Sequence, residues 1–287
     1  MLRFVTIVLI TGTLLTQASA QELTGTLKRV ADTGEIRIGY VPNSPPMSLD
    51  GEDGNPTGYS IALCRSIANA VKTKVGLDEI KLTYVPLILP EDRINAVVNH
   101  DIDIECGPTT VTLSRRERVD FTLLTYITGG AVLSRSGKSI NSVADLSGKT
   151  VAVIRGTTTH AAISNYITSN EFKITLRMIT SRAEGMELLD AGKVDGFASD
   201  RIMLIGQVVR SGNRSNYAIT RDVFSFEPHA LMVARGDTDF RLVADRALAS
   251  IYSTARILRL YNDNIGRYGE PLPPIVKAMY EFQAVGE

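Results

Sequence analysis

The stretch that decides the fold is Glu105–Thr122, which reads ECGPTTVTLSRRERVDFT. It begins where the apolar run of residues 102–104 ends, and two adjacent hydroxyls, Thr109 and Thr110, follow. Arg115 comes five residues after Thr110, within a basic cluster. Arginine is a rigid two-pronged donor that matches the two oxygens of a carboxylate, and hydroxyls can donate or accept beside it. The pattern indicates a carboxylate site at a strand end; a surface turn with solvated arginines is the alternative.

Strands and helices alternate on both sides of this stretch. Periodicity and turn residues predict strands at 35–41, 81–85, 101–105, 119–121, 130–134, 150–154, 174–179, 194–198 and 230–234. They predict helices at 59–73, 91–99, 158–169, 183–191, 201–211, 238–260 and 274–282. This order predicts an α/β fold with two parallel sheets, each covered by helices.

The amino terminus has the features of a secretory signal peptide. Arg3 precedes an apolar run over residues 4–15, and the small residues Ala18 and Ala20 fit a cleavage site. The run is short for a membrane span. We therefore expect residues 1–20 to be removed after secretion, with an uncleaved anchor as the alternative.

Charge and motifs exclude several classes of function. The chain has 31 basic and 31 acidic residues, a balance that argues against a nucleic-acid surface. His100, His160 and His229 are scattered outside any metal or triad spacing, and we interpret all three as structural. No phosphate loop or nucleophile elbow is present, so we expect neither a metal nor a cofactor.

The chain has two cysteines, Cys64 in the first long predicted helix and Cys106 at a strand end. In an oxidising compartment they could pair, because the two elements are expected to pack together. A disulfide there would brace the strand end that carries the hydroxyls. The alternative is two buried thiols, since free cysteine packs as a small apolar residue.

Several short motifs, together with the opening stretch, resemble family 3 solute-binding proteins, the periplasmic amino-acid receptors of ABC importers. They follow the family's order from about residue 35 to residue 268 and lie at 38–40, 45–46, 58–60, 106–122, 145–149, 156–158 and 198–200. The resemblance is greatest to the glutamate/aspartate-binding branch.

This resemblance implies a two-lobed fold of the type II periplasmic-binding class. Lobe 1 would be discontinuous, comprising residues 21–127 and 228–287, and lobe 2 would comprise residues 128–227. Two hinge strands would cross near residues 127–130 and 227–229. A free amino acid would bind between the lobes and pass to a membrane permease, and the protein would be a periplasmic monomer.

The resemblance also assigns roles to the hydroxyls and to the guanidinium. Arg115 would grip the α-carboxylate of the ligand, with the hydroxyl of Thr110 and the backbone of Thr109 beside it. Thr157 and Thr158 open a helix whose backbone N–H groups could meet the same carboxylate. Ordinary N-capping is the alternative for these two threonines.

Further residues would complete the site. Asp200 would pair with the α-ammonium of the ligand, or alternatively cap a helix. Arg93 would meet an acidic side chain of the ligand, or alternatively be a solvated helix arginine. Tyr40 could pack on the aliphatic part of the ligand, or belong to the core.

The sequence departs from the dicarboxylate-binding pattern at four positions. Glu184 stands where the family has a histidine, so it would repel an acidic side chain and favour a polar, amide or cationic one if it faces the ligand; it could equally point to solvent. Family donors are replaced by apolar residues at Val41, Pro90 and Pro108.

The sequence therefore predicts a solute-binding protein for a polar or acidic amino acid. An enzyme on the same fold, similar to the periplasmic cyclohexadienyl or arogenate dehydratases, is the alternative. In such an enzyme Glu184 could act as a general acid.

Overall fold

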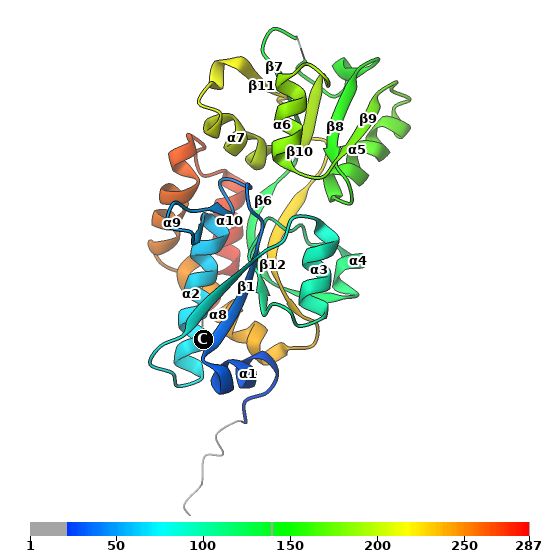
Figure 1. The fold of residues 1–287 in the computed structure, drawn as a ribbon. Helices are drawn as coiled ribbons and strands as arrows, with labels where there is room; N and C mark the ends of the chain where they lie inside the picture. Colours follow the sequence, from blue (N-terminus) through cyan, green and yellow to red (C-terminus); the bar gives the residue numbers. More distant parts are fainter. Residues whose placement is uncertain (1–21, 139, 287) are drawn as a thin grey trace, which may run out of the picture.

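Each of the two lobes contains one five-stranded sheet (Figure 1). The computed structural model describes residues 22–138 and 140–286. The strand order in the first sheet is β4 (Lys81–Pro86), β1 (Glu35–Tyr40), β5 (Ile104–Glu105), β12 (Glu227–Ala234) and β6 (Val119–Thr128). The strand order in the second sheet is β11 (Tyr217–Ile219), β7 (Gly130–Arg135), β10 (Gly196–Asp200), β8 (Thr150–Ile154) and β9 (Thr175–Ile179). The α/β fold with two lobes is confirmed.

Both sheets are mainly parallel, as expected, and each has one reversed strand next to an edge. In the first sheet β12 runs antiparallel to both of its neighbours, β5 and β6. In the second sheet β7 runs antiparallel to both β10 and β11. The reversed strands are those that enter each sheet from the other lobe: β7 follows β6 after one residue, and β12 brings the chain back.

The strands β6 and β12 lie side by side where the chain passes between the lobes (Figure 1). Their pairing extends from Val119 opposite Ala234 to Thr128 opposite Glu227. Periodicity predicted only residues 119–121 as a strand, and the family resemblance added a crossing strand near residues 127–130. The residues between them were missed because register shifts beside Ala230 and the crossing between lobes disturb the alternation of buried and exposed residues.

The helices of the first lobe come from both ends of the chain. They are α1 (Gly25–Thr33), α2 (Tyr59–Lys74), α3 (Pro90–Val98), α4 (Leu113–Arg116), α8 (Thr238–Tyr252), α9 (Arg256–Asn264) and α10 (Pro274–Gln283). Tyr59 of α2 and Tyr280 of α10 share a buried hydrogen bond of 2.6 Å between their hydroxyls. The last helix is thereby tied into the core beneath the first sheet. The small hairpin of β2 (Leu49–Asp50) and β3 (Pro56–Thr57) also belongs to this part of the chain.

Two helix predictions for this lobe differ from the structure. Helix α1 was not predicted, because its buried apolar side chains are few, Leu27 and Val30. The single helix predicted for residues 238–260 is two helices, α8 and α9. The side chains of Ser253 and Thr254 donate to the backbone carbonyl of Ser250, and such bonds compete with helix continuation.

The second lobe carries α5 (Thr158–Ser169), α6 (Arg182–Asp190) and α7 (Arg201–Arg210). Short 3-10 turns lie at Ala144–Leu146 and Arg214–Asn216 here, and at Gly266–Tyr268 in the first lobe. Strand β10 ends at Asp200, two residues later than the predicted strand end. This shift places Asp200 at the carboxyl end of a strand, facing the space between the lobes.

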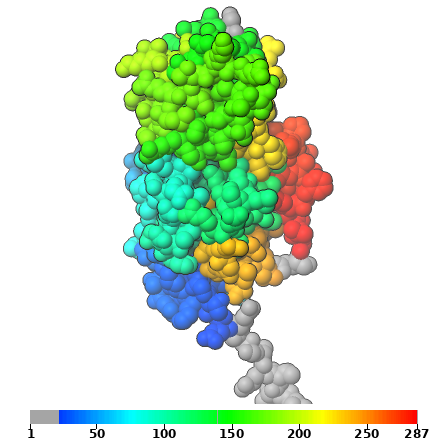
Figure 2. All heavy atoms as spheres, turned by 90° about the vertical axis from the view of Figure 1, so that its right-hand side faces the viewer, coloured from blue at the N-terminus to red at the C-terminus, as the bar shows by residue number. Residues whose placement is uncertain are grey.

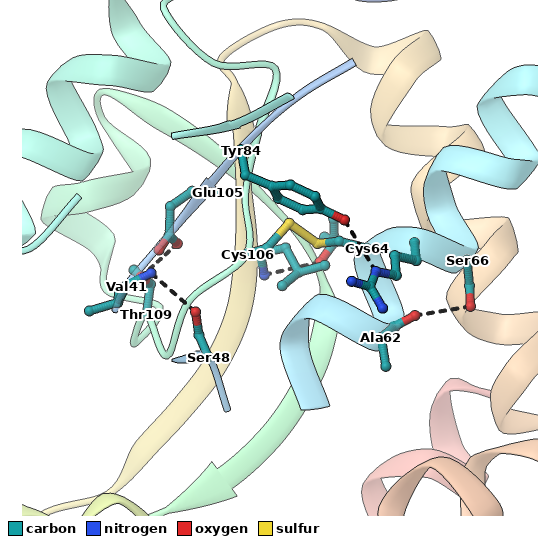
Figure 3. Close-up of a disulfide and its surroundings, with 12 residues drawn as sticks. Val41, Ser48, Ala62, Cys64, Ser66, Tyr84, Glu105, Cys106 and Thr109 are labelled. Carbon is teal, nitrogen blue, oxygen red and sulfur yellow. Dashed lines mark hydrogen bonds between the residues drawn. A yellow bond between two sulfur atoms is a disulfide. The ribbon is translucent and has the colours of Figure 1, made fainter. Parts of the chain in front are cut away.

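Cys64 of α2 and Cys106 form a disulfide, with a Cα–Cα distance of 6.3 Å (Figure 3). The predicted pairing is confirmed. The bridge ties the main helix of the first lobe to the end of β5. Glu105 and Thr109 lie beside it in Figure 3.

The lobes are in contact along a seam. On the face shown in Figure 2, the green second lobe lies directly against the teal and cyan segments of the first lobe. Across the seam, the Gln207 side-chain amide donates to the Asn43 carbonyl at 2.9 Å, and Arg210 donates to the Asn43 side chain at 2.7 Å. Gly206 of the second lobe lies close to the backbone of Pro45 in the first lobe: a Cβ at position 206 would be 2.0 Å from the Pro45 carbonyl oxygen.

Among residues 22–138 and 140–286, no helix combines the length and the apolar character needed to cross a membrane. The predicted signal peptide, residues 1–20, lies outside the described residues and stays a prediction.

Candidate ligand-binding site

A cavity between the lobes collects most of the predicted site residues. The first lobe lines it with Arg93, Pro108, Thr110 and Arg115, and the second with Ile154, Thr157, Thr158, Thr159, Arg182, Ala198, Ser199 and Asp200. Six predicted residues are in this lining, whereas Thr109, Glu184 and Tyr40 are not. The lining also contains an arginine that the sequence analysis missed, Arg182.

Arg115 lies in the short helix α4, which Thr112 caps by accepting a hydrogen bond from the Arg115 backbone. Its Nη1 donates to the Thr110 carbonyl at 2.6 Å. Burial, and secondly the neighbouring Arg93 cation, lower the pKa of Arg115 to about 10. The guanidinium is therefore still charged at neutral pH. It forms no ion pair with an acid of the described chain, so it can accept an anionic ligand.

Arg93, on α3, is buried and already has an acidic partner. Its Nη1 donates to Thr109 Oγ1 at 2.7 Å and lies 3.4 Å from Glu105 Oε1. Thr109 in turn donates to Glu105 Oε2 at 2.8 Å. This network uses the Thr109 hydroxyl behind the cavity wall and balances the charge of Arg93. Glu105 and Thr109 of this network lie next to the Cys64–Cys106 bridge (Figure 3).

A buried carboxylate, Glu227, joins the lobes beneath the cavity. Thr110 of the first lobe donates to its Oε2 at 2.7 Å, and Thr158 of the second lobe donates to the same oxygen at 2.6 Å. Ser225 donates to Oε1 at 2.6 Å. Nothing in the local sequence singled out Glu227, because its partners are distant in the chain.

The start of α5 has a capping side chain and backbone N–H groups that are not bonded within the helix. Thr157 is the N-cap: its hydroxyl accepts from the His160 backbone at 3.0 Å and donates to the Ile154 carbonyl at 2.8 Å. The capping alternative therefore describes the Thr157 side chain. The residue before it, Gly156, has a positive φ of 75°, which favours glycine. Backbone N–H groups at this helix end carry partial positive charge next to the cavity.

Asp200 is buried and does not cap α7 with its side chain. Its Oδ1 accepts from Thr159 Oγ1 at 2.9 Å, and its Oδ2 lies 3.0 Å from His229 Nε2. Burial opposes ionisation, but the hydrogen bond from His229, the electrostatic interactions with His229 and Arg182, and the hydrogen bond from Thr159 outweigh it and lower the pKa of Asp200. The cavity thus contains a carboxylate suited to an ammonium group.

Arg182 is the first residue of α6. Its Nη1 donates to Ser44 Oγ of the first lobe at 2.8 Å, and its Nε is buried without a partner among the described residues. Burial lowers the pKa of Arg182 to about 10, and the chain supplies no ion-pair partner within the described residues. A signal was present in the sequence: a cation in the first turn of a helix is unfavourable, which suggests another role.

Ser181 caps α6 by accepting a hydrogen bond from the Glu184 backbone, and the Glu184 side chain lies outside the cavity lining. Its Oε2 accepts from the Thr180 backbone at 2.9 Å and from the Thr180 hydroxyl at 3.0 Å. The backbone hydrogen bond from Thr180 is the main cause that lowers the pKa of Glu184. This placement matches the alternative in which Glu184 does not face a ligand.

Tyr40 belongs to the core of the first lobe. Its hydroxyl donates to Asp50 Oδ1 at 2.8 Å, and its ring packs edge-on against Tyr84. Burial is the main reason that the pKa of Tyr40 rises to about 12. The core alternative therefore describes the observed position of this residue.

Comparison with known sequences identifies the family. The sequence profile of the bacterial extracellular solute-binding proteins, family 3, matches residues 36–267. The chain belongs to this family. The resemblance described from the sequence motifs is confirmed.

Two relatives have names that specify glutamate and aspartate as their ligands. The chain is 32% identical over 256 residues to the L-glutamate/L-aspartate-binding protein of Pseudomonas aeruginosa, covering 89% of this chain and 83% of the relative. It is 27% identical to the glutamate/aspartate import solute-binding protein of Salmonella typhimurium over 87% of this chain and 81% of the relative. These relatives are named as binding proteins.

Solved structures of the family share the fold. The cysteine-binding protein of Campylobacter jejuni has a TM-score of 0.74 and 24% identity, covering 85% of this chain and 94% of the other. At that level of identity the similarity concerns the fold alone, which is the type II two-lobed class.

Proposed function

We propose that this protein is a periplasmic solute-binding protein that captures an acidic amino acid, L-glutamate or L-aspartate, and delivers it to an ABC importer. One observation carries the proposal: two half-buried guanidiniums, Arg115 and Arg182, approach the same cavity from different lobes without an acidic partner among the described residues. Unpaired buried cations are costly, so a ligand that supplies two carboxylates would relieve both.

The charges of the cavity support this choice of ligand. Arg93 is balanced by Glu105, which leaves the cations Arg115 and Arg182 and the anion Asp200 facing the ligand. L-Glutamate and L-aspartate carry the complementary set, with two carboxylates and one ammonium. We assign the α-carboxylate to Arg115, the side-chain carboxylate to Arg182 and the ammonium to Asp200.

The position of Glu184 removes the main argument against an acidic ligand. A carboxylate facing the cavity would have repelled an acidic side chain, but Glu184 is engaged with Thr180 outside the lining. The same placement argues against a dehydratase in which Glu184 donates a proton. We therefore propose binding without a catalytic step; incubation with arogenate or prephenate should give no product.

Calorimetric titration of the ligand-stripped protein tests the ligand assignment. L-Glutamate or L-aspartate should bind more tightly than L-glutamine, L-asparagine or L-arginine. An amide leaves one buried guanidinium unpaired, which costs on the order of 3–5 kcal/mol and corresponds to roughly a hundredfold to several thousandfold in Kd. Tighter binding of an amide or cationic amino acid would contradict the proposal.

A further inference from the structure

His229 lies on β12, where this strand crosses between the lobes, and only 1% of its surface is exposed. The cavity lining does not include it. Its ring meets the cavity residue Asp200 through the 3.0 Å contact between Nε2 and Oδ2. The imidazole therefore contacts the carboxylate that we assign to the ligand ammonium, from outside the cavity lining.

The two ring nitrogens of His229 have unequal surroundings. Nδ1 is buried and has no hydrogen-bond partner among the described residues, so Nε2 makes the ring's one polar contact there. Asp200 is held as the carboxylate, which only accepts hydrogen bonds. The proton of the contact consequently belongs to Nε2, and the imidazole is the donor.

A purely structural histidine explains this arrangement poorly. Burying an imidazole with one nitrogen unsatisfied is less favourable than burying an apolar side chain of similar volume. The contact with Asp200 is what distinguishes His229 from such an apolar residue. Thr159 holds only Oδ1 of the same carboxylate, so the donor at Oδ2 is needed to fix the carboxylate plane.

We propose that His229 is a positioning residue that orients Asp200 toward the α-ammonium, and that it thereby sets the preference for an amino acid over the same dicarboxylate without its amine. The inference rests on the proposed function, since it concerns the same cleft. It assigns a specificity role to a residue of the crossing strand that does not contact the ligand.

The test compares L-glutamate with glutarate, which has both carboxylates and lacks the amine. Calorimetry would be run on the full secreted protein and on His229→Leu, His229→Gln and His100→Asn. A lost hydrogen bond to a charged group predicts that His229→Leu reduces the preference for L-glutamate over glutarate by about tenfold to a hundredfold. His229→Gln keeps an N–H donor at a similar reach and should restore most of the preference.

The control, His100→Asn, changes an exposed histidine whose φ of 57° suits asparagine, and it should leave the preference unchanged. An unchanged preference in His229→Leu would overturn the inference, as would an equal loss in the Gln and Leu variants. Failure of the wild-type protein to bind either compound would instead overturn the proposed function, and the inference with it.

A second measurement does not depend on the folding of the His229 variants. In protein labelled with ¹⁵N-histidine, NMR should show one imidazole with a slowly exchanging proton on Nε2, and Asp200→Asn should shift that signal. A wild-type spectrum without such a proton, or a signal indifferent to Asp200→Asn, would contradict the inference.

Discussion

At the scale of single residues, the two unpaired arginines should divide the recognition of the ligand between them. Arg115→Met should weaken the binding of every amino acid, because all of them have an α-carboxylate. Arg182→Met should weaken the binding of acidic amino acids alone and narrow the gap between L-glutamate and L-glutamine. Each loss is expected to be about 3–5 kcal/mol, since it leaves a carboxylate buried and unpaired. Titration with both ligands gives the comparison.

Arg116→Met is the matched control, since Arg116 is the exposed neighbour of Arg115 in α4. It should leave both affinities unchanged. If Arg182→Met weakened L-glutamate and L-glutamine equally, the side-chain assignment would be wrong.

Arg182→Met should also affect the ligand-free protein. Burial lowers the pKa of Arg182 from 12.5 to about 10, so the folded state disfavours its cation at neutral pH, and this cost disappears only as pH rises above about 10. Replacement by methionine should therefore favour closure of the lobes without ligand, which small-angle scattering would show as a ligand-free protein more compact than the wild type. Added L-glutamate should raise the Tm of the wild type and not of this variant.

At the scale of elements, the Cys64–Cys106 bridge should contribute both stability and order to the site. It closes a loop with a sequence separation of 42. Loop-closure entropy then predicts that replacing both cysteines by alanine lowers the free energy of unfolding by about 4 kcal/mol. Denaturant unfolding measures this loss.

The wild type in a reducing agent should reproduce the behaviour of the cysteine-free variant. The affinity for L-glutamate should fall less than the stability, because the network of Arg93, Glu105 and Thr109 remains intact when the bridge is absent. If the cysteine-free variant were as stable as the wild type, the disulfide would make no contribution to the stability of the fold.

Elements with strong local signals were predictable from the sequence. Helix α5 lies where the sequence placed it, and β8 has the predicted ends, because a cap and a run of apolar residues define them locally. The middle of the crossing strand β6 and the break between α8 and α9 were not predictable, since neighbours from elsewhere in the fold or a few side-chain bonds decide them.

Residues of the candidate site also divide into those with a local sequence signal and those whose partners are distant in the chain. Arg115 and Asp200 could be located from local motifs, because Arg115 follows the end of β5 and Asp200 is the last residue of β10. The roles of Arg182 and Glu227 depend on partners far along the chain: Ser44 is 138 residues from Arg182, and Thr110 is 117 residues from Glu227. No pattern in one sequence reports such separations.

At the scale of the whole molecule, Gly206 should control whether the lobes can close. A Cβ at this position would meet the Pro45 carbonyl oxygen of the other lobe at 2.0 Å. Gly206→Ala should therefore weaken L-glutamate binding, by about fivefold to a hundredfold if the overlap costs 1–3 kcal/mol. The ligand-free protein should be no less stable, because alanine is favoured over glycine within a helix by about 0.5–1 kcal/mol.

Small-angle scattering can separate closure from a local defect. The wild type should become more compact when L-glutamate is added, and Gly206→Ala should not. Arg210→Ala removes a bond to Asn43 on the same seam without adding an atom there, and it should still close. If Gly206→Ala binds L-glutamate and becomes compact as the wild type does, the lobes do not meet along this seam in the ligand-bound protein.

The hydrogen bonds that Glu227 accepts determine which way the hydroxyls of Thr110 and Thr158 in the cavity lining are oriented. Each hydroxyl has a single proton, and those of Thr110 and Thr158 are both directed to this carboxylate. Only oxygen lone pairs then remain toward the cavity at these two positions. Lone pairs repel a carboxylate and attract an ammonium, so we expect the buried glutamate to make these two neutral side chains favour the amine end of the proposed ligand.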